Sequence, residues 1–159
     1  MKKVLFVFMF ALLAIGVQAQ QGSKAIMPKL GYQTEFERLG LGVEGRYFLT
    51  NNIRIAPGLT FLVPNNNITG LDVDINVHYV FPIEGVQGLA LYPFVGGAML
   101  NNRISVSGVS ASDTSFGINI GAGGQYDITD NGYLNFEFKY TFVEHQDPAY
   151  FMLGYGIRF

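Results

Sequence analysis

The chain has 159 residues, which suits a single domain, and 49% of them are hydrophobic. It contains no cysteine, so disulfide bonds cannot stabilise the fold. The 12 Asp and Glu residues outnumber the 10 Lys and Arg residues, and the formal net charge of -2 excludes the strongly basic surface that nucleic-acid binding requires.

The first twenty residues have the organisation of a secretory signal peptide. Lysines at positions 2 and 3 precede an apolar run that ends at Val17, and Ala19 completes a small-x-small cleavage motif. The run is shorter than the roughly 20 residues that a helix needs to cross a bilayer. We therefore predict cleavage after Ala19, which leaves a signal peptide at 1–19 and one domain at 20–159.

In the remaining chain, large apolar residues alternate with small or polar ones, which predicts strands rather than helices. Eight alternating runs follow one another, most of them of about 9 to 12 residues. That length suits a tilted strand that crosses a bilayer, whereas strands of soluble proteins are mostly shorter. In chain order, the runs lie at 26–32, 39–49, 53–63, 71–81, 89–100, 116–126, 134–142 and 151–159.

The seventh run has the clearest local signals. Its apolar residues alternate with Asn135, Glu137 and Lys139, which places these polar side chains on one face. Asp130-Asn131-Gly132 immediately before it is a typical hairpin turn. We therefore predict a hairpin between the sixth and seventh strands.

The fifth run and the segment after it are harder to interpret. Tyr92 and Phe94 compete with Leu91 and Val95 for the apolar face, so the alternation leaves the orientation of this strand open. The stretch at 101–115 is rich in serine and asparagine, which predicts the longest loop of the chain.

Three prolines, Pro28, Pro57 and Pro93, lie within the predicted strands. Proline lacks the backbone N–H group that a fully paired strand donates. We expect bulges, or positions near a rim of the sheet, to accommodate them.

Alternation alone also fits a soluble sandwich or a soluble ligand-binding barrel. Three observations favour a membrane barrel: the long strands, short turns at every second link, and aromatic residues that close the strands leading to these turns. Those aromatic residues are Tyr47, Phe81, Tyr126 and Phe159. The predicted fold is an all-β, eight-stranded antiparallel up-and-down transmembrane β-barrel.

The polar residues opposite the apolar face are nearly balanced in charge, and we predict that they pair inside the barrel as a polar plug. The plug comprises Glu44, Arg46, Arg54, Asp72, Asp74, His78, Asp127, Glu137, Lys139 and Arg158, and Lys29 and Arg38 share their face. The candidate ion pairs are Arg46 with Asp72 or Asp74, and Arg158 with Asp127 or Glu137.

The last strand resembles the insertion signal of small bacterial outer-membrane barrels. Gly154 precedes the terminal aromatic Phe159 by five residues, and Tyr155 and Ile157 occupy the alternate apolar positions. At Met152 the sequence departs from this pattern, in which a polar residue is usual.

Over its whole mature length the chain resembles the porin-like barrels of the outer membrane protein A transmembrane-domain and outer membrane protein X type. The Gln20-Gln21 start after cleavage is also similar to exported proteins of Bacteroidetes. The resemblance implies a location in the bacterial outer membrane, with outer-membrane lipid and the barrel-assembly machinery as partners.

Several motifs suggest chemistry but have a simpler interpretation. Gly40, Gly42 and Gly45 match the spacing of a dinucleotide-binding fingerprint, yet the strand alternation runs through them and no helix pattern follows. His78 could act as a pH-sensitive group but is better explained as a satisfied interior histidine. His145, in an acidic loop, could bind a metal, but one loop rarely supplies a whole site. We predict no cofactor and no metal.

Some outer-membrane barrels of this size are lipid A deacylases, which use a histidine followed two residues later by a serine. Neither histidine of this chain has a serine at that position, so we predict no enzyme. The expected function is a non-catalytic barrel that contributes to envelope integrity or surface adhesion through its extracellular loops. The alternatives are a narrow porin or hydrophobic-solute channel and a soluble secreted ligand-binding barrel.

Overall fold

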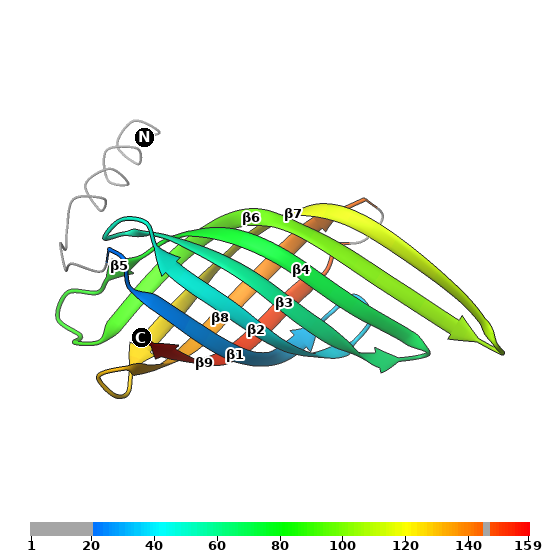
Figure 1. Cartoon of the computed structure of the whole chain (residues 1–159), viewed down its shortest axis with the longest axis horizontal. Helices are drawn as coiled ribbons and strands as arrows, with labels where there is room; N and C mark the ends of the chain where they lie inside the picture. Colours follow the sequence, from blue (N-terminus) through cyan, green and yellow to red (C-terminus); the bar gives the residue numbers. More distant parts are fainter. Residues whose placement is uncertain (1–20, 145–146) are drawn as a thin grey trace.

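The computed structural model describes residues 21–144 and 147–159, so the predicted signal peptide and His145 lie outside the described residues. The described chain forms one antiparallel sheet that closes on itself as a barrel (Figure 1). None of its described residues form a helix long and apolar enough to cross a membrane. The strands are β1 (Lys24–Gln33), β2 (Arg38–Phe48), β3 (Ile53–Asn65), β4 (Ile68–Tyr79), β5 (Phe81–Pro82), β6 (Leu89–Val106), β7 (Val109–Asp127), β8 (Gly132–Val143) and β9 (Ala149–Arg158).

Two strand pairings close the sheet into a barrel, and neither joins strands with consecutive numbers. β1 pairs with β9 at one joint, and β4 pairs with β6, which carries the two-residue β5 at its edge. The remaining long strands, β2, β3, β7 and β8, each pair with the strand before and the strand after them in sequence. β5 continues the line of β4 and pairs with the same strand, β6, so the two count as one strand of the barrel. The predicted eight-stranded antiparallel barrel is therefore confirmed.

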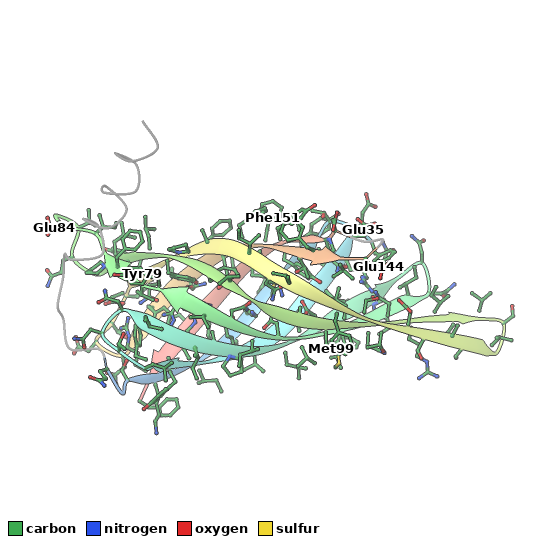
Figure 2. The ribbon with its side chains drawn as sticks, turned by 90° about the horizontal axis from the view of Figure 1, so that it is seen from above. Glu35, Tyr79, Glu84, Met99, Glu144 and Phe151 are labelled. Carbon is green, nitrogen blue, oxygen red and sulfur yellow. The ribbon has the colours of Figure 1, made fainter. Side chains whose placement is uncertain are left out.

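The two ends of the barrel differ. The hydrogen bond from Phe159 N to Lys24 O places both ends of the described chain at one end of the barrel, called here the terminal end. The opposite end carries the β1–β2, β3–β4, β6–β7 and β8–β9 connections and is called the hairpin end. Figure 2 shows Glu35 and Glu144 at the hairpin end and Glu84 at the terminal end.

The period-two alternation sorts side chains between the outside and the lumen. Ile75 and Leu153 point outward and are 56% and 58% exposed, whereas Glu44 and Glu137 are buried inside. The orientation of the fifth predicted strand, which lies in β6, is determined by its neighbour β7. Tyr92 and Phe94 lie in the lumen, because Gly121 and Gly123 on β7 leave room for their rings. Leu91 and Val95 consequently face outward.

Each of the three prolines interrupts the ladder on one side only. Pro28 pairs with Val43 of β2, but the β1–β9 ladder is interrupted at this position. Pro57 pairs with Ile75 of β4 and interrupts the ladder to β2. Pro93 pairs with Ala122 of β7, and the break between β4 and β5 lies directly opposite it.

The β4–β5 break shows how the unpaired backbone is satisfied. Val80 lies between the two strands, directly after Tyr79, whose position on the ladder is opposite Pro93 and its missing N–H group. The N–H of Val80 donates to Asn52 O at 2.7 Å, and its carbonyl accepts from Asn52 Nδ2 at 2.9 Å. The backbone and the side chain of Asn52, in the turn before β3, thus satisfy both backbone groups of Val80 on the β3 side.

The prediction of a long loop at 101–115 is wrong. β6 and β7 continue through this segment as a paired two-stranded ribbon, and only Ser107 and Gly108 form the turn. Both have positive φ, 50° and 83°, as the tight turn of a hairpin requires. Serine and asparagine suit this ribbon because it projects beyond the remaining strands (Figure 1) and residues 103–114 are exposed. We call residues 101–115 the projecting hairpin.

Candidate functional site in the polar interior

The middle of the lumen contains a central cluster of Lys29, Glu44, Arg46, Tyr92 and Glu137. Lys29 Nζ donates to Glu44 Oε2 at 2.8 Å, and Arg46 Nε donates to Glu44 Oε1 at 2.7 Å. Arg46 Nη2 also contacts Glu137 Oε2 at 3.4 Å, and the Tyr92 hydroxyl lies 2.9 Å from the same oxygen. Two carboxylates and two cations, all buried, therefore bind one another across the lumen.

An upper cluster lies nearer the hairpin end. Lys139 Nζ donates to Asp72 Oδ2 at 2.7 Å and to Asp74 Oδ2 at 2.5 Å. The ammonium group also lies 4.4 Å from the centre of the Tyr150 ring. Asp72 and Asp74 are two residues apart on β4, so their side chains share the inner face and meet one lysine from the opposite wall.

Two arginines have amide or imidazole partners in place of carboxylates in the described structure. Arg38, at the hairpin end, donates to Gln33 Oε1 at 2.8 Å and to Asn102 Oδ1 at 2.9 Å. Arg54, toward the terminal end, donates to Gln125 Oε1 at 2.8 Å and lies over the Tyr92 ring. The lumen thus holds ion pairs in its middle and a planar guanidinium group toward each mouth.

His78 is a fixed, neutral partner of Arg54. Arg54 Nε and Nη2 lie 3.2 and 2.8 Å from His78 Nδ1, and a guanidinium group can only donate. Nδ1 is therefore the acceptor, and the hydrogen of the neutral ring is on Nε2. The ring stacks on Tyr92 with centroids 4.7 Å apart and planes 7° apart.

The same geometry argues against a metal in the central cluster. Candidate ligand atoms of Glu44, His78 and Glu137 lie within 4.8 Å of one another. A metal ion would need an unprotonated Nε2, but the Arg54 contact keeps the hydrogen there. It would also compete with Lys29 and Arg46 for both carboxylates. We assign these residues to the ionic network.

The structure changes the predicted ion pairs in part. Every residue of the predicted plug is buried except Asp127 and Arg158. These two form the predicted pair at 2.6 Å, but at the rim of the terminal end, with side chains 40% and 27% exposed. The predicted pairing of Arg46 with Asp72 or Asp74 is wrong, because Lys139 binds both aspartates.

Several interior residues were absent from the predicted plug. Lys29 and Arg38 are buried and belong to the network, and their alternation with apolar residues is the same signal that identified Arg46. Tyr92 and Tyr150 are also buried in the lumen, where their hydroxyl groups join the network. No alternation could assign Tyr92, because its strand is apolar on both faces.

The residues of the predicted insertion signal lie on β9 and at the end of the chain. Tyr155, Ile157 and Phe159 point outward and are 39%, 45% and 78% exposed. Gly154 faces the lumen, where a Cβ atom would lie 2.8 Å from Met27 Sδ. Met152, where the sequence departs from the usual pattern, is buried inside against Leu62 and Tyr150.

Comparison with known proteins supports the same architecture. The profile described as outer membrane protein beta-barrel domain matches residues 9–159. The comparison with curated proteins gave no match.

Three solved structures are similar over almost their entire length. The N-terminal β-barrel domain of Pseudomonas aeruginosa OprF has a TM-score of 0.76 at 24% identity, covering 89% of this chain and 100% of that one. Neisserial surface protein A has a TM-score of 0.72 at 15% identity, with coverages of 90% and 100%. Ail, the attachment invasion locus protein of Yersinia pestis, has a TM-score of 0.65 at 20% identity, with coverages of 87% and 99%.

Proposed function

Because the chain belongs to the outer membrane protein beta-barrel family and lies in the bacterial outer membrane, we propose that it is a non-catalytic surface anchor with a closed lumen. Its outward apolar face contacts the lipid of that membrane. In this proposal the terminal end faces the periplasm and the hairpin end faces outward, so that the projecting hairpin reaches beyond the cell surface.

The observation that carries the closed lumen is the buried ionic network. An eight-stranded barrel has an interior just wide enough for side chains to fill. Here the central cluster joins β1, β2, β6 and β8, and the upper cluster joins β4 and β8. Their charged groups are at most a few per cent exposed, which supports a lumen that is closed to hydrated ions.

Planar-bilayer conductance tests the closed lumen. We expect no steady conductance from the refolded wild-type barrel, and a measurable one when Glu44→Ala and Arg46→Ala are combined, because both side chains cross the lumen. The matched control, Asp127→Ala with Arg158→Ala, removes an ion pair from the exposed rim and should conduct like the wild type. Steady wild-type conductance that the central substitutions do not change would favour a narrow pore instead.

The surface role rests on the projecting hairpin. Its inner face continues the line of the lumen and carries Ile104, Val106 and Val109, which are 46%, 54% and 74% exposed. Exposed apolar groups that recur on one face of a protein mark interaction sites. The outer face is polar: Ser105 and Ser110 contact each other at 3.2 Å, and Arg103 Nη2 donates to Ser110 Oγ at 3.3 Å.

The charge at the hairpin end indicates which ligands fit. Ail has been solved in complex with the heparin analogue sucrose octasulfate, a polyanion. The exposed charged residues described at this end of the present chain are Glu35, Glu37, Arg103, Asp113, Glu144 and Asp147. Five acidic groups against one basic group would repel a polyanion. We therefore propose a neutral or cationic surface ligand.

The barrel-assembly machinery is the second partner in this proposal. The exposed aromatic Phe159 and the outward Tyr155 and Ile157 support recognition of the last strand. These residues contact no ion pair of the lumen, so a defect caused by changing them can be separated from a defect of the network.

A further inference from the structure

The outer wall of the barrel carries an apolar groove of about 860 Å³ near the terminal end. Its floor consists of three outward positions with small or compact side chains on two adjacent strands: Pro93 on β6, and Ala122 and Gly124 on β7. Pro93 pairs with Ala122, and Leu91 pairs with Gly124, so the floor is continuous across the two strands. Elsewhere on the outer wall the outward positions are mostly large.

Aromatic side chains form both walls of the groove. Phe136 and Phe138 on β8 form one wall, which we call the aromatic ridge, and they are 51% and 37% exposed. Tyr79 and Phe81 form the other wall, with ring centroids 6.4 Å apart. None of the residues that line the groove is charged.

We propose that this groove is the contact surface of a homodimer in the outer membrane, in which the aromatic ridge of each copy packs into the groove of the other. The ladder places ridge and floor side by side, because Ala122 pairs with Phe138 and Gly124 pairs with Phe136. Ridge and floor therefore lie at nearly the same depth in the bilayer. A two-fold axis along the membrane normal preserves depth, so both ridges can enter both grooves at once.

Packing energetics favour a second copy over a lipid chain. In a bilayer, removing apolar surface from lipid gives no hydrophobic gain, because the lipid tails are equally apolar. Association depends on close van der Waals contact, which small residues permit by letting another backbone approach. A pair of rigid phenylalanine rings fits such a floor at a fixed depth, and burying them against it requires no charged group to be desolvated.

The test measures the monomer–dimer equilibrium of the full mature barrel in liposomes, by single-molecule photobleaching over a range of protein densities. We expect Gly124→Leu to fill the groove and to weaken dimerisation at least about tenfold. The barrel should still fold, since a Cβ atom at Gly124 would lie 3.2 Å from the flexible Leu91 Cδ2 and 3.9 Å from Ala90 O. Gly97→Leu is the matched control, because this outward glycine lies outside the groove and its nearest neighbour would be Gly117 O at 4.0 Å.

Cysteine cross-linking identifies the face, since the natural chain contains no cysteine. A short cross-linker with two thiol-reactive groups should link two Ala122→Cys copies but not two Val43→Cys copies. The Val43→Cys cysteines lie outward on β2, across the barrel. A monomer at all densities, or equal linking at both positions, would overturn the proposal. So would native mass spectra of a monomer that retains a phospholipid, if Gly124→Leu abolished that retention, because the groove would then be a lipid site.

Discussion

The strand pair β6–β7 passes through two environments, and its outer face is apolar in the barrel wall but polar in the projecting hairpin. Within the barrel wall, Val95 and Ile118 point outward and Asn119 points into the lumen. In the projecting hairpin, Ile104 lies on the face that continues the lumen, and Ser105 lies on the outer face. The antiparallel ladder runs through both parts without interruption. The surrounding medium, and not the strand itself, therefore determines whether the outer face is apolar.

The two regions also differ in how firmly each side chain is held. A residue in the barrel wall faces either hydrocarbon or a filled lumen, so an unsuitable side chain has no favourable alternative. A residue in the projecting hairpin has water within reach on both faces. The same substitution should therefore have a large effect in the wall and a small one in the hairpin.

The largest effect is expected from Glu44→Gln, because it leaves Lys29 and Arg46 without their shared carboxylate. Breaking a buried pair from one side costs about 3 to 5 kcal/mol. Urea unfolding of the barrel in lipid vesicles measures this loss. Asp127→Asn breaks the exposed rim pair and should cost less than about 1 kcal/mol. Similar costs for the two would mean that the lumen is as wet as the rim.

A charge on the lipid-facing wall should have the next largest effect. Ile75→Arg places a guanidinium group in hydrocarbon and should lower the unfolding free energy by about 2 to 4 kcal/mol. Ile104→Arg is the matched change in the projecting hairpin, at similar exposure, and should stay within about 0.5 kcal/mol. If both variants lost the same stability, the assignment of Ile75 to the lipid face would be wrong.

Deleting Phe159 should affect assembly more than stability. Its side chain is 78% exposed, so its loss removes little packing from the folded barrel. We expect the level of folded protein in the outer membrane to fall several-fold, while the urea midpoint of protein refolded in vitro shifts little. Deletion protein that reached normal levels in the membrane would rule out a role in recognition of the last strand.

Shortening the projecting hairpin should have the smallest effect on stability. Replacing residues 105–110 with Asn-Gly retains the Ile104–Ala111 pair and joins the strands by a favourable two-residue turn. The unfolding free energy should change by less than about 0.5 kcal/mol. Adhesion of intact cells to a cationic or neutral surface should be lost, and unchanged adhesion would transfer the surface role to the other connections.

The sequence predicted the walls of the barrel well because lipid imposes a simple rule on them. Outward positions such as Phe138 and Leu153 must be apolar across the whole bilayer, and this alone reveals strand number and facing. The rule applies only within the membrane. It fails at 101–115, where the ribbon leaves the bilayer and its serines and asparagines resemble a loop.

Strand register could not be predicted from the same pattern. Sliding one strand past another by two residues leaves every side chain on its original face, so alternation cannot choose between such registers. Arg46 therefore could not be assigned to Glu137 across the lumen, or Lys139 to Asp72. The orientation of Tyr92 depended on Gly123 of the next strand, which is distant in sequence.

The gap that Pro28 leaves in the β1–β9 ladder bears on how the barrel closes. This joint connects the two ends of the chain, so its contacts have the greatest sequence separation in the molecule and the greatest loop-closure entropy to overcome. All other strand pairings can form when a strand is added to the one that precedes it in sequence. The β1–β9 pairing thus has the largest entropic cost of formation and also lacks hydrogen bonds at Pro28. We expect it to form last during folding and to open first during unfolding.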